Sequence, residues 1–141
     1  MTARNTLKLK ELIFNTLNND LTLRTLLGSE GRVRHANPQQ LSEYPLVVYS
    51  VLEDVDNPYE TDQQSGIANS RVIVQSFSAS VDSAQSDALD DRVFALLDGQ
   101  RLSNTSIQAY SIYRVSRTPT FESEVEVWNV ASAYDLYNAT I

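Results

Sequence analysis

Residues 70–99 read SRVIVQSFSASVDSAQSDALDDRVFALLDG, and along this stretch the apolar period changes from two to about 3.6. The alternation from Ile73 to Val81 predicts a half-buried strand. Ser83 then offers an N-cap hydroxyl, and a helical stripe follows until Asp98–Gly99 ends it. The members of this stripe are Leu89, Val93, Leu96 and Leu97. A strand followed by a capped helix therefore forms the centre of the predicted domain.

Upstream of this unit, the pattern predicts two short helices and two strands. The first helix runs from about Thr6 to Asn18, and Asp20 caps a second one that Gly28 ends. Residues 32–35 favour a short extended segment. Residues 45–52, PLVVYSVL, favour a central strand with proline at its start.

Downstream, alternation predicts a strand over 107–115, with Tyr110, Ile112 and Arg114 on one face. Residues 117–121 favour an irregular link, and a long final strand begins at Val125. The apolar C-terminal tail is expected to continue the sheet or to dock on a neighbour. This order predicts one α+β domain over residues 1–141, with an antiparallel or mixed sheet and helices on one face.

The polar stretch 53–69, EDVDNPYETDQQSGIAN, breaks the pattern and is long for a hairpin connection. Loops of this length in compact domains often carry function. We therefore expect a long hairpin loop that either is an extended flexible tip or, as we favour, becomes ordered against a partner.

Composition excludes several classes of protein. The chain has 141 residues, no cysteine and a net charge of -7. Disulfides and cysteine metal sites are absent, and the acidic balance disfavours non-specific DNA binding, which needs Lys and Arg on phosphates. No apolar run approaches the roughly 20 residues of a membrane helix. The charged N-terminal stretch does not look like a secretory signal.

Candidate sites for chemistry are few. His35 is the only histidine and is expected to be a surface residue, with Arg32 and Arg34 disfavouring its protonated form. Two acidic groups have the composition of a metal site, but we interpret them as a solvated helix face and a charged strand edge. They are Asp87, Asp90 and Asp91, and Glu122, Glu124 and Glu126. We expect no catalytic residue, no metal and no cofactor.

The order of these signals resembles the tail-completion, or tail-terminator, proteins of tailed bacteriophages. The resemblance rests on the opening helix pair LKLKELIFNTLNNDLTLRTLLG, the strand YPLVVYSVLED, the unit RVIVQSFSASVDSAQSDALDDRVFALLDGQRL and the closing RVSRTPTFESEVEVWNVASAYDLY. Together these segments cover nearly the whole chain.

This resemblance implies a non-enzymatic virion component, assembled in the bacterial cytoplasm. Such proteins form a ring, commonly a hexamer, at the head-proximal end of the tail. The ring stops growth of the tail tube and presents the surface to which the head joins. The implied partners are further copies of the chain, the tail tube protein and the connector or neck proteins. DNA passes through the ring without specific binding, and no membrane is involved.

We expect the subunit interface at the long loop and beside the last turn, because an Arg–carboxylate contact suits such a ring. The residues chosen by position are Asp56, Tyr59, Glu60, Asp62, Arg114 and Arg117.

Three alternatives stay open from the sequence. The chain could be a head-completion or neck subunit between portal and tail. It could be a metal-dependent hydrolase built on Asp87, Asp90 and Asp91, or a generic bacterial adaptor domain.

Overall fold

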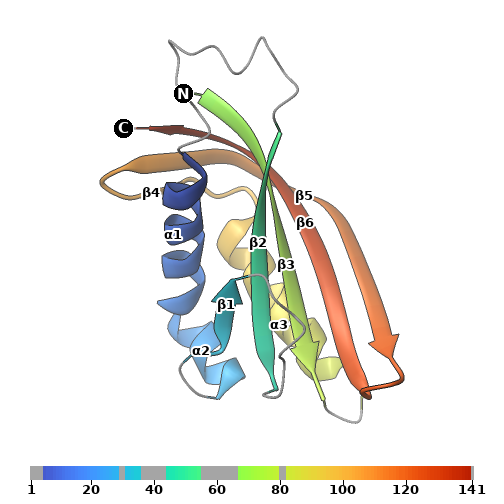
Figure 1. Cartoon of the computed structure of the whole chain (residues 1–141). Coiled ribbons are helices and arrows are strands. Elements are labelled where there is room, and N and C mark those ends of the chain that lie inside the picture. Colours follow the sequence, from blue (N-terminus) through green and yellow to red (C-terminus); the bar gives the residue numbers. More distant parts are fainter. Residues whose placement is uncertain (1–4, 29–30, 36–43, 55–66, 80–81, 141) are drawn as a thin grey trace.

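Among the residues described by the computed structural model, three helices pack against one face of a six-stranded mixed sheet (Figure 1). The structure describes residues 5–28, 31–35, 44–54, 67–79 and 82–140. The strand order is β1-β2-β3-β6-β5-β4, in which β1 is parallel to β2 and every other neighbouring pair is antiparallel. The long strands curve, so that the sheet forms half of a barrel. This arrangement confirms the predicted α+β class with helices on one face.

The helices are α1 (Asn5–Asn18), α2 (Leu21–Leu27) and α3 (Ala84–Leu97). The strands are β1 (Val33–His35), β2 (Leu46–Asp54), β3 (Ile67–Ser78), β4 (Leu102–Ser103), β5 (Ile107–Glu122) and β6 (Val127–Thr140). No described helix is long and apolar enough to cross a membrane.

Asp20 organises the N-terminal helices as the sequence predicts. Its carboxylate accepts a hydrogen bond from the Leu23 backbone N–H at 2.8 Å and so caps α2. Gly28 ends α2 in the left-handed region, at φ 83°. Asp20 also accepts two hydrogen bonds from Arg92 of α3, at 2.7 and 2.8 Å. One carboxylate therefore both starts α2 and ties it to α3.

The start of α3 differs in detail from the prediction. Ser83 occupies the N-cap position, but its hydroxyl makes no capping hydrogen bond and donates to Asp87 instead. The Asp82 carboxylate accepts from the Ala84 backbone N–H at 3.0 Å. The helix ends at Leu97 and is followed by Gly99 at φ 71°, as expected.

Strands β2 and β3 extend into the region predicted as a loop. Their ladder continues to the pair Asp54 and Asn69. Residues 55–66 of the predicted 53–69 loop lie outside the described part of the chain.

The structure of the C-terminal third shows that the irregular link predicted over residues 117–121 is wrong. Residues 117–121 belong to β5, which runs without interruption to Glu122. Val125 and Glu126 lie in the tight turn before β6, so the three glutamates surround a hairpin tip and do not line one strand face. The tail continues the sheet as β6, as predicted.

Regular alternation in β5 fails at two β-bulges. The register shifts once between Tyr110 and Tyr113 and again between Arg114 and Ser116. Each bulge adds a residue to one strand and increases its bend. Ile112 is consequently buried in the core, whereas Tyr110, predicted to share its face, lies on the opposite face and stacks on Tyr137.

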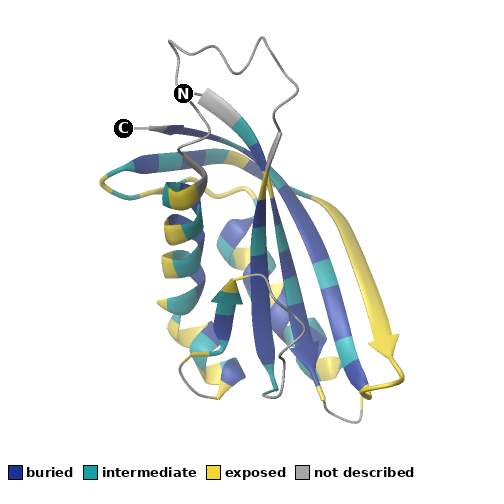
Figure 2. Ribbon diagram, in the orientation of Figure 1, coloured by how far each residue is buried: buried dark blue, intermediate teal, exposed yellow. Residues whose placement is uncertain are grey.

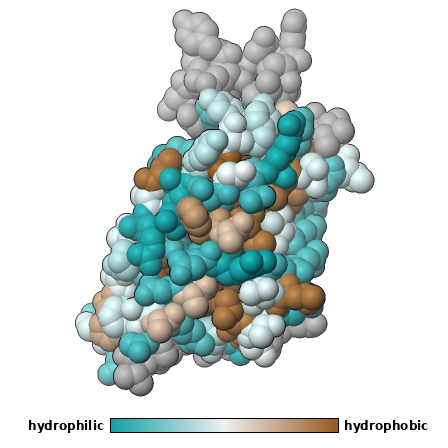
Figure 3. Space-filling model, turned by 180° about the vertical axis from the view of Figure 1, so that it is seen from behind, coloured by the Kyte–Doolittle hydropathy of each residue, from teal (hydrophilic) through white to brown (hydrophobic). Residues whose placement is uncertain are grey.

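The main core lies between the helices and the sheet and includes Leu9, Leu17, Leu89, Tyr134 and Ile112. A smaller buried cluster occupies the other face of the sheet, at Leu46, Val48, Phe77 and Val127. Figure 3 shows the molecule from behind, where hydrophilic side chains cover most of the surface and hydrophobic ones form separate patches.

Candidate interface: the arm and the outer groove

The distal part of the β5–β6 hairpin is the most exposed regular structure of the described chain. We call residues 116–132 the arm. Its β5 half is exposed along its whole length, whereas the β6 half contributes buried residues to the body (Figure 2). Two large apolar side chains are open to solvent at the end of the arm: Phe121 and Val125, exposed by 45% and 58%. An exposed strand with apolar side chains is a typical feature of an interaction surface.

The turn after α3 supports the root of the arm. The Gly99 backbone N–H donates to the Ile112 carbonyl at 2.7 Å, and the Asp98 carboxylate accepts from the Arg114 backbone N–H at 2.8 Å. Both contacts satisfy hydrogen-bonding groups of the β5 backbone at the bulges.

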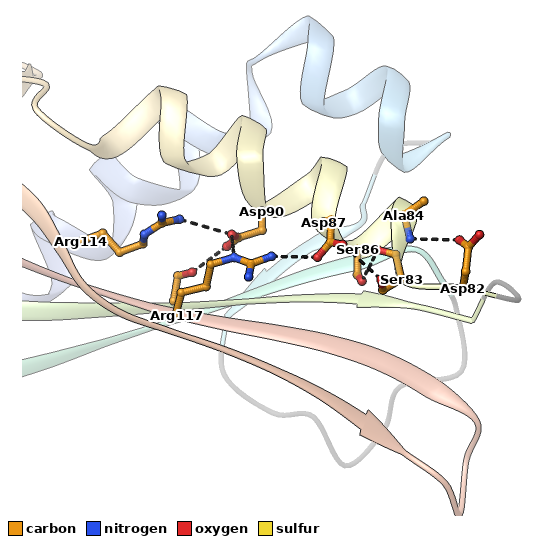
Figure 4. Close-up of polar contacts among 9 residues, drawn as sticks. Asp82, Ser83, Ala84, Ser86, Asp87, Asp90, Arg114 and Arg117 are labelled. Atoms are coloured by element: carbon orange, nitrogen blue, oxygen red, sulfur yellow. Dashed lines mark hydrogen bonds and ion pairs between the residues drawn. The ribbon is translucent and has the colours of Figure 1, made fainter.

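A group of charged residues, which we call the anchor cluster, joins the arm to α3 (Figure 4). The Asp90 carboxylate accepts from Arg117 Nε at 2.9 Å and from Ser132 Oγ at 2.7 Å. Arg114 Nη1 lies 3.4 Å from Asp90 Oδ2. Arg117 Nη2 donates to Asp87 Oδ1 at 2.8 Å. Two strands of the arm are thus held on one helix.

Burial makes this cluster structurally important. Asp90 is completely buried, and a buried carboxylate is tolerated only when it is paired and hydrogen-bonded. The hydrogen bond that Arg117 donates to the Asp90 carboxylate raises the pKa of Arg117 above its ordinary value. Burial, with the nearby Asp90 charge, raises the pKa of Tyr134, so this phenol stays neutral. The Arg114 guanidinium also lies over the Phe94 ring, 4.1 Å from its centroid.

The interpretation of Asp90 as part of a solvated helix face is wrong. It lies three residues before Val93 and seven before Leu97, a spacing that places it on the buried stripe of α3. Ser86, four residues earlier, is buried on the same stripe. Asp91, the next residue, is exposed as expected.

Arg114 and Arg117, two of the residues predicted for the subunit interface, are brought together by the anchor cluster. Three residues apart on a regular strand, they would point to opposite faces. The second bulge turns both toward α3. Sequence reasoning missed Asp90 as the shared partner of the two arginines and Ser132 as a further donor to Asp90. Only the helical spacing of Asp90 could have pointed to its role. The predicted loop residues Asp56, Tyr59, Glu60 and Asp62 lie outside the described residues.

The surface beside the arm contains a half-open hollow of about 800 Å³, which we call the outer groove. It lies on the sheet face away from the helices. Leu52, Tyr113 and Val115 form apolar parts of its lining, and each is at least half exposed. Arg71 and Asp135, which also line it, form a bidentate ion pair at 2.7 and 3.1 Å across β3 and β6.

The described residues contain no group of three metal-binding side chains from His, Cys, Asp and Glu. Asp87 and Asp90 are each bound to an arginine, an arrangement that occupies their oxygens. His35 is exposed at the end of β1 with its ring edge-on to Tyr49, and burial followed by the Lys10 charge lowers its pKa. The lowered pKa agrees in direction with the expectation, but its main cause is partial burial, and the contributing charge is Lys10 instead of the neighbouring arginines.

Comparison with known proteins finds similar chains among solved structures. No protein-family model matches the chain, and no curated protein matches it. Among solved structures, the chain is similar to a chain from the structure described as the virion of a native gene transfer agent particle. The two share 16% sequence identity with a TM-score of 0.76, over 93% of this chain and 94% of the other. At this identity the likeness establishes a common fold across almost the entire length of both chains.

Proposed function

We propose that this chain is a structural protein of a phage-like virion, a single-domain subunit that assembles into a ring at the head-proximal end of a tail. In this role it ends growth of the tail tube and presents the surface to which the head joins. It acts by binding other proteins and performs no catalysis.

The fold likeness to a gene transfer agent virion chain carries this proposal, because it spans 93% of this chain. The order of sequence signals points the same way. An exposed arm supplies a surface for contact with neighbours, and the net charge of -7 suits a ring through which DNA passes without being held. A head-completion or neck subunit shares the same supporting likeness and is the second candidate.

Electron microscopy of particles assembled without this chain separates the two roles. We expect tails longer than normal, because nothing stops growth of the tube. Full-length tails that remain unattached to heads would favour the neck subunit. Normal, complete particles in the absence of the chain would contradict both, and particles complemented with the intact gene serve as the control.

A further inference from the structure

The proposed ring leaves open which surfaces meet between neighbouring subunits. A closed ring is built from heterologous contacts, in which two different patches of each copy join head to tail. The described residues should therefore offer one projecting surface and one receiving surface at separate places. The arm and the outer groove meet this requirement.

The end of the arm, residues 121–126, carries two exposed apolar side chains surrounded by three glutamates. Phe121 packs against Trp128, with ring centroids 4.8 Å apart, which holds the ring in place. Val125 projects from the turn. Glu122, Glu124 and Glu126 are all exposed around these two side chains.

The outer groove offers apolar side chains that could contact those of the arm end. Its apolar side chains are Leu52, Tyr113 and Val115, and its charged pair includes the half-exposed Arg71. Tyr137, another lining residue, stacks on Tyr110 with ring centroids 6.0 Å apart. Exposed Arg101 lies over the Tyr110 ring, 5.7 Å from its centroid. The charges of Arg71 and Asp135 offset each other in their ion pair. The exposed Arg101 therefore supplies the positive charge beside the groove that complements the acidic arm end.

The two surfaces cannot meet within one subunit. Val115 in the groove and Phe121 at the arm end are six residues apart on one extended strand, which separates them by roughly 20 Å. The same strand is poorly suited to pairing with another strand along its edge, because Pro119 lacks the N–H donor that a ladder requires. Contact through side chains is favoured over addition of a strand.

We propose that the arm end of one copy occupies the outer groove of the next copy, with Phe121 and Val125 against Leu52, Tyr113 and Val115. This contact rests on the proposed ring. Each contact is small, but closure of a ring makes every subunit bind twice, so weak pairwise contacts suffice for a stable assembly. The anchor cluster sets the direction of the arm and hence the angle between successive copies.

Cross-linking of single-cysteine variants tests this geometry, because the natural chain has no cysteine. One protein carries Val125→Cys and a second carries Leu52→Cys. We expect the mixture to give a cross-linked dimer with a short bis-maleimide, while each protein alone gives little. A mixture of Val125→Cys with Leu21→Cys is the matched control, because Leu21 is 72% exposed on α2, away from the groove. We expect it to give at least ten-fold less dimer.

Val125 and Leu52 are both exposed, so these substitutions leave the fold intact, which circular dichroism checks. Equal yields from the test and control mixtures overturn the contact, as does efficient dimer formation by Val125→Cys alone, which indicates a symmetric contact. If the unmodified chain still forms a closed oligomer in that case, the proposed ring stands and uses other surfaces. A chain that never associates overturns both.

Discussion

Replacement of Asp90 by alanine should lower the free energy of unfolding by about 3 kcal/mol, the cost typical of breaking a buried ion pair from one side. The carboxylate binds Arg117, Arg114 and Ser132, and it is completely buried. Its loss leaves the buried Ser132 hydroxyl without its acceptor and two arginines without their shared charge. For a chain of this size we expect a decrease in Tm of roughly 10 °C.

Asp91→Ala is the matched control for this prediction, since the neighbouring side chain is exposed on the same helix. We expect the control to change the unfolding free energy by less than about 0.5 kcal/mol. Calorimetry of both variants measures the difference. Equal stabilities of the two would show that the anchor cluster does not hold the arm on α3.

Asp20→Ala should lower the free energy of unfolding by about 2 kcal/mol, because the helix cap and the ion pair with Arg92 are lost together. Asn at the same position still caps a helix but carries no charge. We therefore expect Asp20→Asn to lower the free energy of unfolding by about half as much as Asp20→Ala. The difference between the two variants then measures the contribution of the helix cap.

The pH dependence of the Asp20→Asn effect has a definite sign. The hydrogen bond from Arg92 lowers the pKa of Asp20 below its ordinary value of 3.8, so the folded state favours the charged carboxylate. The stabilisation is complete above the unfolded pKa and is lost as the pH falls through the folded pKa. Chemical denaturation should show a constant difference between wild type and Asp20→Asn from pH 5 to 8, shrinking below pH 3.8. A difference that grows toward acid would contradict the assignment.

Local signals predicted most of the fold. The capped helices, Gly28 and the strands around Val47 and Val74 follow from hydrophobic period and cap chemistry, which depend on neighbouring residues. The β-bulges could not be predicted in this way. They result from pairing between β5 and β6 and from the support of β5 by Asp98 and Gly99. The continuous strand through Pro119 was missed for the same reason.

The candidate interface was predicted less well than the fold. Arg114 and Arg117 were chosen by position as residues of the subunit interface. Their contacts with Asp90 could not be predicted, because they depend on a bulge in one element and on the buried stripe of another. The outer groove joins residues from β2, β3, β5 and β6, and no local pattern marks it. Whether these arginines also contact a neighbouring subunit stays a prediction.

If copies of this chain close into a ring, light scattering over a range of concentrations should detect a fixed solution mass. With a subunit mass of 15.8 kDa, we expect a plateau at an integer multiple, six for the expected hexamer, reached by the chain alone or on addition of tail tubes. A monomer under every one of these conditions, or an open series whose mass keeps rising without a plateau, would contradict the proposed ring.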